Sequence, residues 1–273
     1  MPDAAALDAL ADELLGARQS AAVVDPPSRR HPGFSLADGY AVAQRLEQRR
    51  VAGGARVVGA KLGFTSEALW SLLGVSEPFW APLYDDTVTE ARTVSLAGLV
   101  EPRLEPEIVV GLRQPLSPGA TPDEVAQALG WAALGFELAQ CRYPGWAFAA
   151  GDAVADGGLH GLLVVGDRVE LDPAAAAALS TVELELSCDG AVLAGGRATD
   201  VLGGPLEVMG WLLRLPGVAQ LPAGTVVTTG SITAPAPVEP GQTWRAGARG
   251  PVGLGELEIV IGARPGAPVQ SPS

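Results

Sequence analysis

Two glutamates stand two residues apart at the start of an apolar segment of the chain. Glu105 and Glu107 belong to the stretch 102–110, PRLEPEIVV. Because strand side chains alternate between two faces, both carboxylates would point the same way, about 6–7 Å apart along the strand. Two like charges held that close repel each other unless a cation lies between them. The spacing indicates either a divalent-metal site or, as the simpler alternative, the solvated face of a strand.

A third acid, Glu137, interrupts a second apolar segment, Leu134–Ala139. A carboxylate is rarely buried without a partner, because removing a charge from water is costly. Three carboxylates that leave room for water or substrate are typical ligands of Mg²⁺ or Mn²⁺. The three glutamates together therefore favour the metal interpretation.

Lys61 is the only lysine of the chain and lies in the segment 56–63, which has the pattern of an apolar strand. Burial lowers the pKa of an ammonium group toward values useful for proton transfer. Lys61 is therefore a candidate acid or base. The alternative is an ammonium at the surface or paired with an acid.

Composition excludes several classes of protein. A net charge of −13 argues against a nucleic-acid or anionic-membrane partner. No apolar run reaches the ~18 residues that a membrane span needs. The two cysteines, Cys141 and Cys188, form neither a disulfide framework nor a thiolate metal site. Since the acidic N-terminus also lacks the pattern of a signal peptide, we expect a cytoplasmic protein.

The expected elements alternate short strands with a few helices. Helices are predicted over 4–18, over 36–51 with a Ser35/Asp38 capping box, up to Leu73, over 122–130 after the Thr121 cap, and over 206–214. The segment 77–86, rich in proline and aromatic residues, is predicted as a loop. The predicted strands are the one that carries Glu105 and Glu107 and the segments 56–63, 132–139, 161–165, 182–187, 191–194, 225–229 and 257–261.

This pattern predicts an α+β protein. A small helical N-terminal region, 1–75, would precede a mixed, mostly antiparallel β core over 76–265. A disordered tail is expected over 266–273.

An ordered set of motifs resembles the 2-keto-4-pentenoate hydratase/2-oxo-3-hexenedioate (4-oxalocrotonate) decarboxylase family of the fumarylacetoacetate hydrolase superfamily. The similarity runs from about Gly33 to Gly262, nearly the whole chain. The motifs that carry it are Gly59–Ser66, Leu73–Val75, Ala81–Asp86, Pro102–Ile108, Phe136-Glu137, Cys141–Tyr143, Asp152–Asp156, Gly204–Leu206 and Thr229–Val238.

The resemblance implies a fumarylacetoacetate-hydrolase-type β core in which Glu105, Glu107 and Glu137 hold Mg²⁺ or Mn²⁺ beside Lys61. A 2-oxo acid would bind the metal through its carboxylate and carbonyl oxygens, and the cation would stabilise an enolate. Lys61 would transfer protons. Thr229 would bind substrate oxygens, although a purely structural turn explains it equally well. The resemblance also implies a homo-oligomer.

Several residues depart from the family pattern. Hydratases of the family usually carry an acid where this chain has Phe79 and Trp80, which either cover the core or line an enlarged apolar substrate pocket. Glycines replace polar residues at positions 157 and 204. His160 is a candidate relocated acid or base, with a structural histidine as the alternative.

Arg142 is expected to orient a site carboxylate or the substrate, or to form a surface ion pair, and Asp156 is carried over as a substrate-binding residue.

The leading hypothesis is a hydratase-like lyase acting on an unsaturated 2-oxo acid. The second is the decarboxylase of the same family. A catalytically weakened binding partner is a further alternative, motivated by Phe79, Gly157 and Gly204. Another is a relative acting on a larger, biosynthetic substrate, which the Phe79-Trp80 change would allow.

Overall fold

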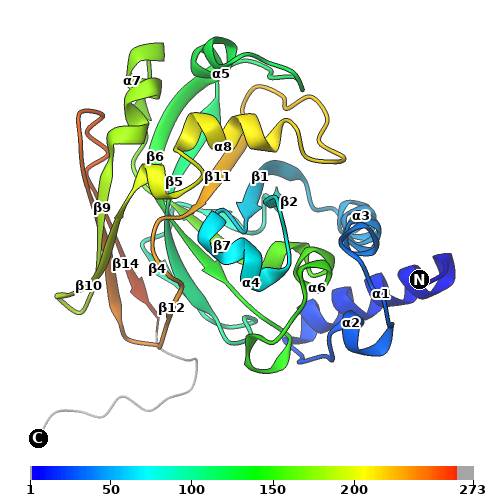
Figure 1. The fold of residues 1–273 in the computed structure, drawn as a ribbon. Helices are drawn as coiled ribbons and strands as arrows, with labels where there is room; N and C mark the ends of the chain where they lie inside the picture. Colours follow the sequence, from blue (N-terminus) through cyan, green and yellow to red (C-terminus); the bar gives the residue numbers. More distant parts are fainter. Residues whose placement is uncertain (1, 263–273) are drawn as a thin grey trace, which may run out of the picture.

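Two β-sheets pack against each other, and the N-terminal helices lie on the far side of the larger sheet (Figure 1). The structure, a computed structural model, describes residues 2–262. The class predicted from the sequence, α+β with a helical N-terminus, is confirmed.

The larger sheet has nine strands in the order β2-β1-β11-β5-β6-β7-β3, with β12 paired to β5 and β8 to β6. Most pairs are antiparallel, while β1 pairs with β11 and β3 with β7 in parallel. Its strands are β1 Val57–Gly63, β2 Phe79–Tyr84, β3 Val88–Thr89, β5 Arg103–Leu112, β6 Leu129–Ala139, β7 His160–Val165, β8 Val169–Glu170, β11 Val226–Ser231 and β12 Ala236–Pro237.

The smaller sheet has the order β10-β9-β13-β14-β4. Its strands are β4 Thr93–Val94, β9 Glu183–Cys188, β10 Ala191–Arg197, β13 Thr243–Arg249 and β14 Glu256–Ile261. The main hydrophobic core joins the two sheets, because Ile108 and Phe136 of the larger sheet share one buried cluster with Leu186 and Ile259 of the smaller. Met209 of helix α8 (Pro205–Leu212) completes this contact.

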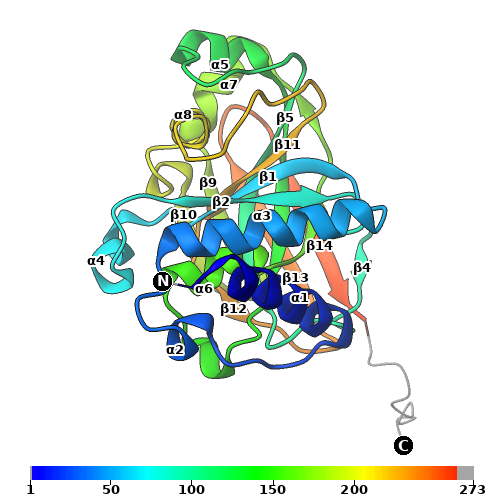
Figure 2. The same cartoon turned by 90° about the vertical axis from the view of Figure 1, so that its right-hand side faces the viewer.

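The helices α1 (Ala4–Ser20) and α3 (Leu36–Ala52) form a separate layer in front of the larger sheet (Figure 2). The predicted Ser35/Asp38 capping box begins α3, so the local signal is confirmed. Apolar residues of both helices pack with Ala155 of α6 (Ala150–Ala155). The other helices are α2 Pro27–Arg30, α4 Trp70–Leu73, α5 Pro122–Ala128 and α7 Pro173–Ala178. None of the helices within residues 2–262 is long and apolar enough to cross a membrane.

The prediction of a loop over 77–86 is wrong, because Phe79–Tyr84 forms strand β2 antiparallel to β1. Pro82 pairs with Ala60 inside this strand. A proline lacks the N–H that a central strand needs, but β2 lies at the edge of the sheet, where one side is unpaired. Strand β13, which is central in the smaller sheet, was not predicted from the sequence.

The predicted N-terminal region 1–75 contains β1, and β1 lies between β2 and β11 in the larger sheet. The boundary at residue 75 stays a prediction. The predicted disordered tail, 266–273, lies outside the described residues.

Candidate metal centre

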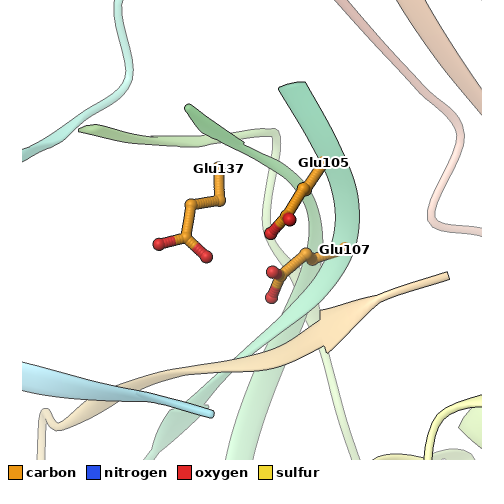
Figure 3. Close-up of side chains that lie close together, drawn as sticks. All are labelled: Glu105, Glu107 and Glu137. Carbon is orange, nitrogen blue, oxygen red and sulfur yellow. The ribbon is translucent and has the colours of Figure 1, made fainter. Parts of the chain in front are cut away.

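The three glutamates meet on one face of the larger sheet. Glu105 and Glu137 are direct cross-strand partners on β5 and β6, and Glu107 follows two residues along β5. One carboxylate oxygen from each lies within 4.8 Å of the others. Figure 3 shows the three side chains converging from the two strands. Glu107 and Glu137 are fully buried, whereas Glu105 remains partly exposed.

The carboxylates strongly influence one another's ionisation. Burial and the negative charge of Glu137 raise the pKa of Glu105 to about 7 and the pKa of Glu107 well above its usual value. Burial would also raise the pKa of Glu137, but Lys61 and His160 lower it to about 2. The cluster therefore prefers to hold a proton or a cation near Glu105 and Glu107.

The chemistry of this donor set fits a divalent cation. The Oε2 atom of Glu107 accepts a hydrogen bond of 2.8 Å from the Gly230 N–H, but its buried Oε1 atom has no hydrogen-bond partner among the described residues. A buried carboxylate oxygen without a partner is costly. A hard cation between carboxylate oxygens removes that cost, and oxygen ligands are those that Mg²⁺ prefers.

Lys61 of β1 lies beside the carboxylates and is only 4% exposed. Its Nζ atom lies 2.9 Å from Oε2 of Glu137 and donates to the carbonyl of Gly158 at 3.1 Å. Burial by itself lowers the pKa of Lys61, but Glu137, Glu105 and Glu107 together outweigh burial and raise that pKa. The sequence predicted a lowered pKa for Lys61. Without a cation that direction is wrong, because three carboxylates surround the one ammonium.

His160, at the start of β7, contacts the cluster from the other side of Glu137. Its Nδ1 lies 2.8 Å from Oε1 of Glu137, and its Nε2 lies 3.0 Å from Oγ1 of Thr87. Burial lowers the pKa of His160, which favours the neutral ring. Since a carboxylate only accepts, the one N–H of a neutral ring belongs on Nδ1. The Thr87 hydroxyl, 3.0 Å from Nε2, donates to the carbonyl of Tyr84 at 3.1 Å. Thr87 carries no sequence signal that would have identified it.

The chain before His160 forms an unusual turn, from Asp156 to His160, which we call the 156–160 turn. Gly157, Gly158 and Leu159 all have positive φ angles, of 64°, 71° and 58°. Glycine adopts this backbone at little cost, whereas leucine does so with strain. The glycine at position 157, a departure from the family pattern, suits this backbone.

Arg142 and Asp156, both predicted to bind substrate, pair with each other. Nη1 of Arg142 donates to both carboxylate oxygens of Asp156, at 2.7 and 2.8 Å, and both side chains are buried. This pair holds the first residue of the 156–160 turn. A structural role is thereby supported, and contact with substrate stays a prediction.

Phe79 and Trp80, predicted together as substrate-binding, lie on opposite faces of β2 because they are consecutive strand residues. The Phe79 ring is buried against Phe64, with ring centroids 4.6 Å apart, and its centroid lies 5.9 Å from Nζ of Lys61. A Cβ atom on Gly158 would lie 2.8 Å from the Phe79 ring, so the ring fills space that the glycine leaves. Trp80 instead donates through Nε1 to the carbonyl of Pro216 at 2.9 Å.

Thr229 donates its hydroxyl proton to the carbonyl of Ile108 at 2.9 Å. This hydrogen bond joins β11 to β5, and the hydroxyl proton of Thr229 would have to leave it to bind a substrate oxygen. The predicted role in substrate binding stays a prediction. The neighbouring Thr228 is the register partner of Lys61, and its buried hydroxyl has no hydrogen-bond partner among the described residues. Thr228 carries no signal in the sequence that would have identified it as a neighbour of Lys61.

Comparison with known proteins shows which enzymes the chain is similar to. No protein-family model matches the sequence. The chain is 32% identical over 251 residues to a 2-hydroxyhexa-2,4-dienoate hydratase from Comamonas testosteroni, covering 88% of this chain and 93% of the relative. It is 30% identical over 241 residues to a 4-oxalocrotonate decarboxylase from Pseudomonas putida, covering 85% and 89% of the two chains.

The fold of the chain also matches solved structures. A 4-oxalocrotonate decarboxylase from Pseudomonas putida G7, complexed with magnesium and adipate, superposes with a TM-score of 0.88 at 28% identity, over 96% of this chain and 99% of that one. A putative fumarylacetoacetate isomerase/hydrolase from Oleispira antarctica, 18% identical and covering 76% of this chain and 94% of that one, shares the fold with a TM-score of 0.59.

Proposed function

Since the chain belongs to the family of 2-keto-4-pentenoate hydratases and 4-oxalocrotonate decarboxylases, we propose that it is a divalent-metal-dependent lyase of unsaturated 2-oxo acids. The observation that carries this proposal is the convergence of Glu105, Glu107 and Glu137 beside Lys61. Hydration is the first candidate reaction, because a hydratase is similar over 93% of its own length.

The three glutamates would hold the metal, and we propose Mg²⁺, with Mn²⁺ as an alternative of similar ligand preference. When bound, the cation would orient the carboxylate and keto oxygens of a 2-oxo acid and stabilise the negative charge that develops on the keto oxygen.

Lys61 would exchange protons with the carbon chain of the substrate. Its ammonium lies 2.9 Å from Glu137, and a molecule bound at the carboxylates would therefore lie within its reach. In hydration, a 2-hydroxydienoate would first take up a proton on carbon as its enol becomes a ketone. Water would then add to the remaining conjugated double bond. A positioned general acid or base of this kind typically contributes about 10²–10⁴-fold to a rate.

His160 would orient Glu137 and not exchange protons with substrate. Both of its ring nitrogens already contact protein atoms, Glu137 Oε1 and Thr87 Oγ1. Such a contact fixes the direction in which a ligand carboxylate points.

Decarboxylation of a 2-oxo-hexenedioate is the second candidate reaction. The solved decarboxylase matches nearly the whole chain, and the same site would accept the electrons that departing CO₂ leaves behind. A larger substrate is a further alternative, and so is a catalytically weakened relative. The homo-oligomer implied by the family resemblance also remains a proposal, which sedimentation of the purified protein can check.

The test is turnover by the purified protein with Mg²⁺. Loss of dienoate absorbance with 2-hydroxypenta-2,4-dienoate, without CO₂ release, would support hydration, whereas CO₂ release from 2-oxo-3-hexenedioate would support decarboxylation. EDTA should abolish either reaction, and Lys61→Met should lower kcat by about 10²-fold or more. Absence of turnover on both substrates, with Mg²⁺ shown to bind, would favour the weakened relative or the enzyme with a larger substrate over both candidate reactions.

A further inference from the structure

The first helix of the chain reaches the candidate site through Arg18, in the last turn of α1. Nη1 of Arg18 donates a hydrogen bond of 3.1 Å to the backbone carbonyl of His160, 142 residues away in the sequence. We propose that Arg18 is a positioning residue, which holds the end of the 156–160 turn so that Gly158 and His160 meet Lys61 and Glu137. The catalytic part of this proposal depends on the proposed function.

The 156–160 turn supplies two of the contacts that organise the cluster. The carbonyl of Gly158 accepts from Lys61 at 3.1 Å, and the His160 ring contacts Glu137 at 2.8 Å. Leu159, between them, has a φ of 58°. A strained backbone persists only where its surroundings hold it. A small displacement of this turn would therefore move both partners of the cluster.

Contacts at both ends hold the turn in place. At its beginning, Asp156 binds Arg142. At its end, the His160 carbonyl accepts from Arg18 and also from Nε2 of Gln140, at 3.3 Å. Of these contacts at the two ends of the turn, the one from Arg18 comes from the N-terminal helices and links that layer to the site.

The surroundings of Arg18 indicate that its position is costly. Burial and the like charges of Arg50 and Arg142 lower the pKa of Arg18 to about 10, while Asp156 partly offsets them. A guanidinium held among other cations needs a compensating contact. The carbonyl of His160 supplies one.

A simpler alternative is that Arg18 only fastens α1 to the molecule. Arg49 does this for α1 and α3, since its Nε donates to Asp12 at 2.6 Å and its Nη2 to Asp8 at 3.1 Å. Both arginines thus join α1 to its neighbours, Arg49 to α3 and Arg18 to the 156–160 turn. Arg49→Met is therefore the matched control for Arg18→Met.

The experiment compares Arg18→Met, Arg18→Lys and Arg49→Met in the full chain with Mg²⁺. Histidine labelled with ¹⁵N gives a readout independent of turnover, because the chain has only two histidines, His31 and His160. A His31→Gln variant identifies the His160 signals.

Arg18→Met should shift the His160 ¹⁵N signals. It should lower kcat by about 10-fold, as does loss of a residue that orients a metal ligand, and change KM by less than about twofold. Arg18→Lys should recover part of kcat, because an ammonium can donate to the same carbonyl. Arg49→Met should leave the His160 signals and kcat unchanged even where it lowers the unfolding temperature.

Wild-type His160 signals in Arg18→Met would overturn the proposal, and so would equal shifts in Arg49→Met. Absence of turnover in the unmodified protein would contradict the proposed function instead, and the His160 signals would still decide whether Arg18 positions the turn.

Discussion

At the scale of single residues, the site is a group of like charges that the fold has brought together. Lys61 supplies one positive charge for Glu105, Glu107 and Glu137. Burial prevents water from screening the remaining repulsion, and therefore the pKa values of Glu105 and Glu107 are raised. The remaining repulsion lowers the stability of the folded protein, and a divalent cation bound between the carboxylates would restore that stability.

Replacing Glu107 by glutamine tests metal binding and the cost of the buried negative charge separately. Glu107→Gln should bind Mg²⁺ far more weakly and lose at least about 100-fold in kcat, since loss of a ligand should exceed loss of a residue behind one. The metal-free variant should also be more stable than the unmodified protein at pH 8, because a neutral amide replaces a buried charge. Calorimetric Mg²⁺ binding, steady-state kinetics and urea denaturation measure the three quantities.

The control is Glu101→Gln, because Glu101 is exposed and lies on the same stretch of chain outside the cluster. It should leave all three quantities unchanged. Unaltered Mg²⁺ affinity in Glu107→Gln would show that Glu107 is not a ligand.

At the scale of elements, the N-terminal layer approaches the site through the contact between α3 and α6. A Cβ atom on Gly39 of α3 would collide with the backbone carbonyl of Gly151 in α6. Backbone atoms cannot move aside as a flexible side chain can. The helix α6 leads directly into the 156–160 turn, so the glycine contact sets how that turn approaches the sheet.

Two glycine substitutions test this packing. Gly39→Ala should lower the free energy of unfolding by about 1–3 kcal/mol, the usual cost of overpacking. Gly16→Ala in α1 should instead raise it by about 0.5–1 kcal/mol, because a Cβ there meets no atom within 4 Å and alanine favours helix. Urea denaturation measures both values. Equal stability of the two variants would contradict the close contact of α3 and α6.

At the scale of the whole molecule, stability should depend on pH in an unusual direction. An unfolded glutamate titrates near pH 4.5, whereas Glu105 in the folded chain titrates at about 7 and Glu107 is raised as well. Between pH 4.5 and 7 the folded state therefore binds more protons than the unfolded state, and stability falls as pH rises. The lowered pKa of His160 makes its own contribution to stability rise with pH over part of this range. We expect the two glutamates together to outweigh this one histidine.

The metal-free protein in EDTA should accordingly unfold at a lower temperature at pH 8 than at pH 5.5, by about 3 °C or more. Excess Mg²⁺ should raise the unfolding temperature more at pH 8, where the carboxylates are ionised, and about 100-fold excess over its Kd should add about 2.7 kcal/mol. Calorimetry at both pH values, with Glu107→Gln as the control, tests this. A metal-free midpoint that rises from pH 5.5 to pH 8 would refute it.

Much of the local structure and part of the site followed from the sequence by itself. The two-residue spacing of Glu105 and Glu107 on an apolar strand places both carboxylates on one side, because strand side chains alternate. Capping residues such as Ser35 and Thr121 began their helices as predicted, since a cap acts on backbone groups only three residues away. Glu137, an acid inside an apolar segment, and Lys61, the only lysine of the chain, were candidates on residue type alone, and the family resemblance placed them beside the pair.

The tertiary structure alone decided what surrounds that site. It makes Glu137 the cross-strand partner of Glu105, places Thr87 behind His160, and brings Arg18 to the turn that ends there. It also makes β2 an edge strand in which a proline is tolerated. Strand register, edge position and contacts across 142 residues depend on how distant segments pack, and no local pattern of residue types encodes them.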